Sequence, residues 1–304
     1  MKSNSLSIHY LLLGFAVLNV STASILVRLA YGEGVHGFAA ASWRLLLSSL
    51  MTGSLLIIYY NNYKGELDRL NLRDLLLMAV SGVSLALHFD LWMLSLAYVA
   101  VAVSVTIVDS YPALLALAGR VIYGERYANI QYLGSLLAMI GIALLSFSSV
   151  GDGVGSNPLL GSLLAFGGMV GVAVYFIVGK GMRSRYSTIV YTTIVYGIAG
   201  VSSVILSIIL GVELLGFTGN AWLYLILLAL VPMLGGHSVL NYVIKRLSLL
   251  ATTVPVLGEP VGATILAYII LGEGVGVETI ILMGLTLTGI GLVLLGEASR
   301  RAGG

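Results

Sequence analysis

The sequence predicts an all-α integral membrane protein whose ten transmembrane helices form two inverted-topology five-helix repeats. Three observations lead to this prediction. Of the 304 residues, 59% are hydrophobic and only 9% are charged, whereas a soluble domain has about 25% charged residues. Apolar runs of the length that spans a bilayer, about 20 residues, follow one another along the chain. Motifs in the fourth and fifth runs return in the ninth and tenth.

The composition also excludes several classes of protein. So few charges cannot cover a soluble or disordered chain, and a formal charge of +2 does not favour nucleic acid as a partner. With no cysteine, the chain has no disulfide, thiolate metal site or cysteine nucleophile. We expect no cofactor and no metal, and the expected partners are membrane lipids and a small-molecule substrate. The sequence indicates no oligomeric state.

Each predicted helix corresponds to one apolar segment between short separators. The separators contain turn residues such as Gly, Asp and Pro, and the longest, Asn61–Arg73, leaves no room for a soluble domain. The ten segments are residues 8–31, 37–60, 74–97, 99–121, 129–149, 158–180, 187–211, 221–244, 249–271 and 276–297.

The placement of Lys and Arg predicts the orientation. With the N-terminus inside, thirteen of the 15 basic residues fall on the inner side, and the loops between helices on the outer side have none. Cytoplasmic loops are enriched in Lys and Arg. We therefore expect a multi-pass protein of the cell membrane with both termini in the cytoplasm.

An internal repeat relates the two halves at an offset of 148 residues. The aligned pairs are Pro112 with Pro260, Gly124-Glu125 with Gly272-Glu273, and Gly141-Ile142 with Gly289-Ile290. The repeats are residues 8–149 and 158–297. Because each contains an odd number of spans, the second inserts upside down. Many secondary transporters share this architecture and bind substrate near the midplane, between the halves.

Motifs in both halves resemble one family. Ser110-Tyr-Pro-Ala-Leu-Leu-Ala-Leu-Ala-Gly-Arg-Val-Ile-Tyr-Gly-Glu125 resembles the fourth helix of the EamA family, within the drug/metabolite transporter superfamily, and Gly258–Glu273 resembles its ninth helix more closely. Arg44-Leu45 matches an Arg of its second helix, and Arg28 falls where the family often has Lys. One departure is Val20-Ser21, where the family has Trp-Gly. The resemblance implies ten helices, cytoplasmic termini and export of small metabolites driven by an ion gradient.

Two acids near the middle of predicted helices are candidates for proton coupling. A charge at the centre of a helix costs about 2.5–3.5 kcal/mol on insertion, so each one suggests a role. Asp109 precedes Pro112 by three residues, and Glu259 directly precedes Pro260. Each proline frees a backbone carbonyl and is a candidate structural hinge. Both acids also have structural alternatives: a protonated Asp109 bonded to a backbone carbonyl, and Glu259 in a polar contact between packed helices. Gly258 and Gly262, on either side of Glu259, allow another helix to approach.

The third predicted helix offers two polar faces. Ser81, Ser84, His88 and Ser95 share one face, which we expect to line the cavity with His88 as a candidate ligand, although a structural His88 is an alternative. Asp90 lies roughly opposite, and we expect it to form an ion pair with Arg44. Arg44 also remains a candidate for binding a substrate carboxylate.

The other cavity candidates are polar residues on three further helices. His237 and Asn241 lie four residues apart on the eighth predicted helix, and Asn19 lies on the first. Tyr111 aligns with Glu259 in the repeat.

These features predict a secondary active transporter rather than an enzyme. It would be a proton-coupled exporter of small metabolites, such as amino acids or their derivatives, working by alternating access. Gly32–Gly37 fits a G-x-G-x-x-G pattern but follows no strand, so it does not indicate dinucleotide binding. The alternatives are an integral membrane enzyme acting on a lipidic substrate with Asp109, Glu259 and His88, and a passive channel or flippase.

Overall fold

The protein is a bundle of helices joined by short loops. The computed structural model describes residues 2–95, 98–99, 101–148, 157–271 and 274–302, and these residues contain no strand. Eight described helical segments are long and apolar enough to cross a membrane: Ile8–Gly32, Gly37–Ile58, Leu72–Ser95, Pro158–Arg183, Thr188–Ile209, Gly219–Val243, Leu249–Ile270 and Val277–Arg301. The chain is therefore an integral membrane protein, as its composition predicts.

The two remaining predicted spans are shorter in the described part of the chain. The fourth predicted span contains two short helices, Val101–Val108 and Tyr111–Ile122, and the fifth contains a shorter apolar helix, Asn129–Leu145. The helices are α1 (Lys2–Val20), α2 (Ala23–Gly32), α3 (Gly37–Ile58), α4 (Tyr60–Leu67), α5 (Leu72–Ser95), α6 (Val101–Val108), α7 (Tyr111–Ile122), α8 (Asn129–Ser148), α9 (Pro158–Arg183), α10 (Thr188–Ile209), α11 (Gly219–Leu228), a π-helix (Ala229–Ser238), α12 (Val239–Val243), α13 (Leu249–Thr253), a 3₁₀ turn (Val254–Gly258), α14 (Glu259–Leu271) and α15 (Val277–Ala302).

Four of the apolar segments are not regular α-helices from end to end. Breaks separate α1 from α2 at Ser21–Thr22 and α6 from α7 at Asp109–Ser110. The π-helix interrupts the segment from α11 to α12, and the 3₁₀ turn interrupts the segment from α13 to α14. Such irregular backbone at membrane depth is tolerated where protein or a water-filled cavity surrounds it.

Polar side chains begin several of the helices. The hydroxyls of Ser187, Thr218 and Ser248 each accept a hydrogen bond from the backbone N–H three residues on, at 3.2 to 3.3 Å. The side-chain oxygens of Asn71 and Asn157 do the same at 3.0 and 3.1 Å. These caps satisfy N–H groups that a helix leaves free in its first turn, so the loops between spans can stay short.

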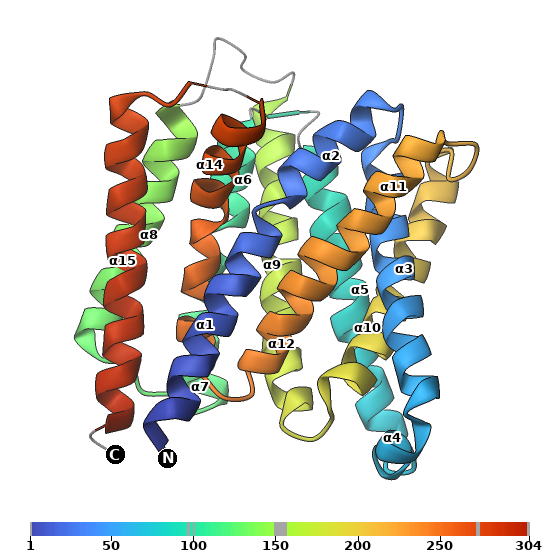
Figure 1. Cartoon of the computed structure of the whole chain (residues 1–304), viewed down its shortest axis with the longest axis horizontal. Coiled ribbons are helices and arrows are strands. Elements are labelled where there is room, and N and C mark those ends of the chain that lie inside the picture. Colours follow the sequence, from blue (N-terminus) through green and yellow to red (C-terminus); the bar gives the residue numbers. More distant parts are fainter. Residues whose placement is uncertain (1, 96–97, 100, 149–156, 272–273, 303–304) are drawn as a thin grey trace.

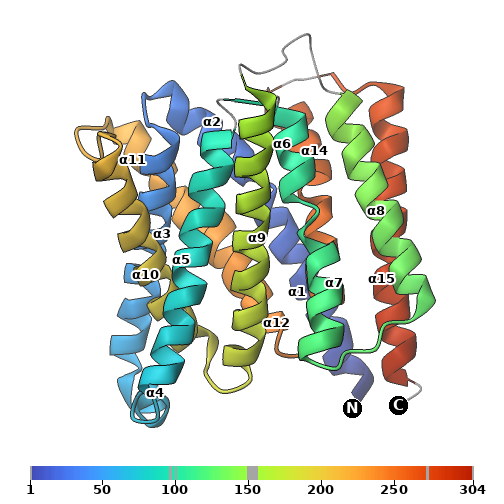
Figure 2. The same ribbon diagram turned by 180° about the vertical axis from the view of Figure 1, so that it is seen from behind.

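The long helices pack in pairs that join the two halves of the sequence. Helix α3 packs on α10, α8 on α15, and α5 on α9, while α1 packs on the π-helix and α2 on α11. In Figure 2, α8 and α15 lie side by side, as do α5 and α9. Glycines allow these approaches: a Cβ on Gly134 would lie 2.5 Å from the carbonyl oxygen of Gly289. A Cβ on Gly141 would lie 2.8 Å from the backbone nitrogen of Thr286.

Both termini lie at the same end of the bundle, together with α4 and the C-terminal end of α7 (Figure 1). We refer to this end as the terminal side. The separator Asn61–Arg73 contains most of α4, which the sequence did not predict. Helix α4 begins directly after Tyr59, which ends α3, and its lack of apolar periodicity concealed it.

Candidate functional site

Two acids lie beside the interruptions in the segments that the sequence repeat aligns. Asp109 occupies the break between α6 and α7, and Glu259 is the first residue of α14, directly after the 3₁₀ turn. Both side chains are half-buried. Glu259 lies within electrostatic range of Asp109 and of Arg44. The structure thus brings together three residues that sequence analysis selected separately.

Proline chemistry accounts for the position of these interruptions. Pro112 is the second residue of α7, and Pro260 is the second residue of α14. A proline has no N–H, so it cannot bond the carbonyl four residues before it. Pro112 therefore leaves the Val108 carbonyl without its usual helical partner, whereas the Val256 carbonyl accepts the N–H of Glu259 at the end of the 3₁₀ turn.

Tyr111 also belongs to this group. Its ring is 4% exposed and stacks on Phe176 of α9 with ring centres 5.9 Å apart. Its hydroxyl lies within electrostatic range of both Asp109 and Glu259. Tyr111 therefore anchors the start of α7 next to the two acids.

The glycine pair around Glu259 packs against the first helix, which confirms the close approach expected there. A Cβ on Gly258 would lie 3.3 Å from the Val17 side chain, and one on Gly262 would lie 2.7 Å from Cβ of Ser21. Ser21 donates a hydrogen bond from its hydroxyl to the carbonyl of Val17 at 2.7 Å. Such local bonds compete with helical ones, and here they occur at the break between α1 and α2.

Arg44 of α3 is buried without an ion pair to a described residue. Only 3% of it is exposed, and its guanidinium carbon lies 4.3 Å from the centre of the Phe89 ring. One Nη donates to the sulfur of Met233 at 3.7 Å. The face of an aromatic ring stabilises a cation by about 2 kcal/mol or more in a desolvated setting. Phe89 therefore replaces part of the hydration that Arg44 loses.

Polar side chains from α9, α10, the π-helix and α12 lie around Phe89 and Arg44. The ring of His237 lies edge-on to Phe89 at 5.7 Å. Asn241 donates from Nδ2 to the hydroxyl of Tyr175 and to the carbonyl of His237, the latter at 2.8 Å. We call this group the Arg44 cluster, and its members are Arg44, Phe89, Tyr175, Tyr196, His237 and Asn241.

Three polar atoms of the Arg44 cluster are buried without a hydrogen-bond partner in the described part of the chain. They are Nε of Arg44, Nδ1 of His237 and Oδ1 of Asn241. Buried polar atoms are almost always paired, so unpaired ones need an explanation such as bound water or a ligand. His237 also lies in the π-helix, and π-helical segments are frequent at functional sites. The cluster can therefore offer donors and an acceptor to a polar molecule.

The predicted ion pair between Arg44 and Asp90 is wrong. Asp90 accepts a hydrogen bond from the hydroxyl of Ser203 at 2.8 Å, and Ser42 donates to Ser203 at 3.1 Å. Asp90 thus faces α10, while Arg44 turns to Phe89 and lies within electrostatic range of Glu259. The hydroxyl of Ser203 on α10 thus provides a partner for the aspartate, which the sequence pattern did not indicate.

The polar face of α5 packs against other helices, although we expected it to line the cavity. Nδ1 of His88 lies 3.1 Å from the carbonyl oxygen of Gly168 in α9. Ser81 shares a hydrogen bond of 2.6 Å with the hydroxyl of Tyr191, and Ser95 shares one of 2.5 Å with Ser104. All three are buried. Close approach of α9 explains the difference, since a Cβ on Gly171 would lie 2.7 Å from the Ser84 carbonyl.

Asn19 contacts the π-helix. A Cβ on Gly235 would lie 2.5 Å from its side-chain oxygen, and its Nδ2 donates to the carbonyl of Phe15 at 2.7 Å. Asn19 is half-buried. Of the predicted site residues, the structure groups Asp109, Tyr111 and Glu259 around the interruptions, and Arg44, His237 and Asn241 in the Arg44 cluster.

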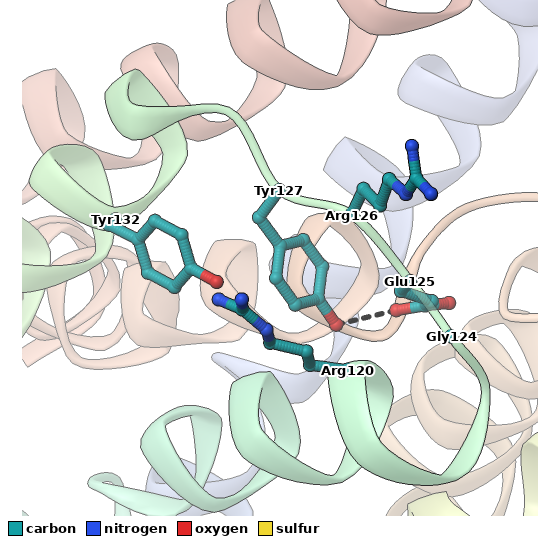
Figure 3. A pocket seen from close by; sticks show the side chains of 6 residues that line it. All are labelled: Arg120, Gly124, Glu125, Arg126, Tyr127 and Tyr132. Carbon is teal, nitrogen blue, oxygen red and sulfur yellow. Dashed lines mark hydrogen bonds between the residues drawn. The ribbon is translucent and has the colours of Figure 1, made fainter.

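A polar cluster on the terminal side was not predicted. Glu125 lies 2.5 Å from Nζ of Lys180, accepts a 2.5 Å hydrogen bond from the Tyr127 hydroxyl, and accepts the backbone N–H of Leu249 at 3.0 Å. Figure 3 shows the bond between Tyr127 and Glu125. Burial, followed by the neighbouring carboxylate, raises the pKa of the Tyr127 phenol, which therefore stays a donor at neutral pH. This Glu125 cluster (Glu125, Tyr127, Lys180 and the Leu249 N–H) joins the ends of α7 and α9 to the start of α13.

The sequence contained one signal for this cluster. Gly124-Glu125 ends the motif that the repeat aligns with Gly272-Glu273, and an acid that recurs at the end of a helix suggests a specific partner. The partner could not be identified, because Lys180 and Leu249 lie far along the chain. The aromatic members of the Arg44 cluster, Phe89, Tyr175 and Tyr196, were missed because mid-helix aromatic residues usually belong to the core.

Comparisons with known proteins agree with this architecture. The sequence model of the EamA-like transporter family matches residues 7–147 and 159–295. The "Uncharacterized transporter YdfC" of Bacillus subtilis (strain 168) is 22% identical over 244 residues, which is 79% of this chain and 77% of that protein. A solved crystal structure aligns with a TM-score of 0.77 and 19% identity over 95% of this chain and 98% of its own. That likeness concerns the fold alone.

Proposed function

Since the chain belongs to the EamA-like transporter family and is a multi-pass membrane transporter, we propose that it is a proton-coupled secondary exporter of small zwitterionic metabolites rather than an enzyme. Amino acids and their derivatives are the proposed substrate class. The observation that carries the proposal is the placement of Asp109 and Glu259 at interruptions in repeat-related helices, in range of the buried cation Arg44.

The packing of the helices supports ten spans in two inverted repeats. If the first five spans are exchanged with the last five, the pair α3–α10 and the pair α8–α15 each map onto themselves. The pair α5–α9 maps onto the packing of the first span against the π-helical span. A two-fold axis in the membrane plane relates inverted repeats in this way. The offset of 148 residues also places the Asp109–Ser110 break on Leu257–Gly258, at the end of the 3₁₀ turn.

The distribution of charge supports an orientation in the cell membrane. Basic residues gather on the terminal side, for example Arg73, Arg126, Lys245 and Arg300, and cytoplasmic loops carry such an excess. Both termini are therefore assigned to the cytoplasm. The Glu125 cluster joins the proposed halves on that side, which fits a state closed toward the cytoplasm.

The chemistry of the site supports the substrate class. Arg44 and the unpaired His237 and Asn241 suit a carboxylate and its neighbouring polar groups. Asp109 and Glu259 suit an ammonium group or protons, because a half-buried carboxylate is desolvated and binds a cation more readily. Competition between substrate and proton for these acids couples export to the proton gradient as the site alternates between the two sides.

Transport by reconstituted protein tests this proposal. A thermal-shift screen against a metabolite library first identifies a substrate, since a bound ligand raises the melting temperature by mass action. Asp109→Asn and Glu259→Gln are then compared with wild type in proteoliposomes. Each should abolish flux driven by a pH gradient and retain substrate exchange between equal pools, because exchange needs no net proton movement.

Glu278→Gln is the matched control, because Glu278 is an exposed acid at the start of α15. It should transport as the wild type does. Wild-type gradient-driven flux in both site variants would show that Asp109 and Glu259 are structural. Flux that does not saturate with substrate would favour a channel.

A further inference from the structure

A basic pocket lies on the terminal side between the end of α7 and the beginning of α8. Its volume is about 490 Å³, and the residues that line it are Arg120, Gly124, Glu125, Arg126, Tyr127 and Tyr132 (Figure 3). We propose that this pocket binds the phosphate group of an anionic phospholipid from the surrounding leaflet. The proposal concerns a lipid site and does not depend on the transported substrate.

The pocket has two arginines that no described residue neutralises. Neither Arg120 nor Arg126 has an ion pair or hydrogen bond within the described part of the chain. Figure 3 shows Arg120 reaching between the rings of Tyr127 and Tyr132, with Arg126 on the other side of Tyr127. A guanidinium group presents paired N–H donors that match phosphate oxygens. The lining therefore carries two positive charges that no described residue neutralises, one on each side of Tyr127.

The acid in the lining does not cancel this charge. Glu125 is 2.5 Å from Lys180 and also binds the Tyr127 hydroxyl and the Leu249 N–H, so its oxygens are occupied on the side of the bundle. The pocket keeps an excess of positive charge. The hydroxyl of Tyr132 adds a polar group to the opposite wall of the pocket (Figure 3).

The surroundings favour a lipid over a free phosphate ion. On α7, Leu117 and Val121 flank Arg120 and are 63% and 72% exposed, and on α8, Leu133 and Leu136 follow Tyr132 and are also exposed. These apolar residues offer contact area to acyl chains next to the pocket. Tyrosines typically mark the headgroup level of a membrane protein. Basic pockets between helices at this level suit anionic headgroups.

Occupancy of the pocket would also affect the closed arrangement of the bundle. Residues 123–128 form the loop between α7 and α8. This loop contributes residues both to the Glu125 cluster and to the lining of the pocket. A phosphate held by Arg120 and Arg126 would fix this loop while Glu125 holds α13. Anionic lipid is therefore expected to favour closure on the terminal side.

Native mass spectrometry of the purified full chain tests the site. Protein in nanodiscs of phosphatidylcholine with phosphatidylglycerol (PG) is released, and the bound lipids are counted. The double variant Arg120→Gln/Arg126→Gln is compared with Arg73→Gln/Arg246→Gln, a control that removes two exposed basic residues of the same side outside the pocket. The pocket variant should lose about thirtyfold in preference for PG, because each arginine near an anionic surface contributes about fivefold. The control should lose less of its preference than the pocket variant does, because Arg73 and Arg246 do not line the pocket.

A second arm separates lipid from soluble phosphate. Melting temperatures are measured in pure phosphatidylcholine nanodiscs with millimolar inorganic phosphate or glycerol phosphate. We expect stabilisation by PG in the membrane and none by the soluble anions. Equal stabilisation by the soluble anions would overturn the assignment to a lipid. An unchanged PG preference in the pocket variant would overturn the site itself.

Discussion

Glu125→Gln should open the terminal side of the bundle. The carboxylate holds three segments together through Lys180, Tyr127 and the backbone N–H of Leu249. Glu125 and Lys180 are 10% and 17% exposed at their side chains, so solvent screens the pair only in part. Glutamine keeps the shape and can accept one hydrogen bond, but it removes the charge.

The magnitude follows from these contacts. Removing one partner of a buried ion pair costs about 3–5 kcal/mol. Lys180 keeps its 2.9 Å bond to the carbonyl of Leu247, and glutamine retains one acceptor, so we expect about 2–3 kcal/mol. Since 1.4 kcal/mol is tenfold in an equilibrium constant, the open arrangement should become about 30 to 150 times more populated.

Cysteine labelling measures this opening, because the chain has no cysteine of its own. Ala251 of α13 is fully buried behind the cluster, so Ala251→Cys should react slowly with a maleimide in the parent protein. Adding Glu125→Gln should raise the rate by about the factor estimated above, whereas adding Glu278→Gln should leave it unchanged.

A double-mutant cycle separates opening from general destabilisation. Lys180→Met should also raise the labelling rate, and the combination with Glu125→Gln should give less than the product of the two effects. An unchanged labelling rate in Glu125→Gln, or strictly independent effects of the two substitutions, would refute the role assigned to the cluster.

Two further predictions concern topology and packing. Asn62→Cys and Leu215→Cys lie in separators at opposite ends of the bundle, so an impermeant thiol reagent outside intact cells should label position 215 alone, and labelling at 62 would reverse the proposed orientation. Gly262→Ala should lower the melting temperature by an amount equivalent to about 1–3 kcal/mol, because its Cβ would lie 2.7 Å from Cβ of Ser21. The control Gly284→Ala, where nothing lies within 4 Å, should leave the stability unchanged or raise it. Equal melting temperatures of the two variants would contradict the packing.

The sequence was sufficient to predict the apolar segments but not their internal irregularities. Hydropathy averages over about 20 residues, so it located the eight described segments that are long and apolar enough to span a membrane, but it could not detect a break of two residues. Proline marked the interruptions near Asp109 and Glu259. No proline marks the break at Ser21–Thr22, where side-chain hydroxyls bond to nearby carbonyls, and the extent of the π-helix around Pro232 was not foreseen.

Long-range polar contacts were the other limit of prediction. Opposite charges at similar depth suggested that Arg44 pairs with Asp90, but charge alone does not show which helix each side chain faces. Ser203 satisfies Asp90 and Phe89 covers Arg44. Asp109 and Glu259 lie within electrostatic range of each other, and the repeat had marked both through the aligned prolines. Symmetry in the sequence was therefore a better guide to spatial proximity than complementary charge.

The short helices α7 and α13 connect the acids at the interruptions with the Glu125 cluster on the terminal side. Helix α7 runs from the break at Asp109 toward Glu125, and α13 runs from Leu249, which Glu125 binds, toward the 3₁₀ turn before Glu259. The two helices also pack against each other. A change of charge at the acids and a change of contacts at the Glu125 cluster therefore act on the same pair of rigid pieces. In the proposed transporter, protonation at the interruptions and closure on the terminal side are linked through α7 and α13. Substituting a glycine within α7, for example Ala116→Gly, should weaken this link, because glycine makes the helix less rigid, while the acids and the Glu125 cluster keep their side chains. Gradient-driven flux should then fall more than substrate binding does. An equal loss of flux and binding would contradict the linkage.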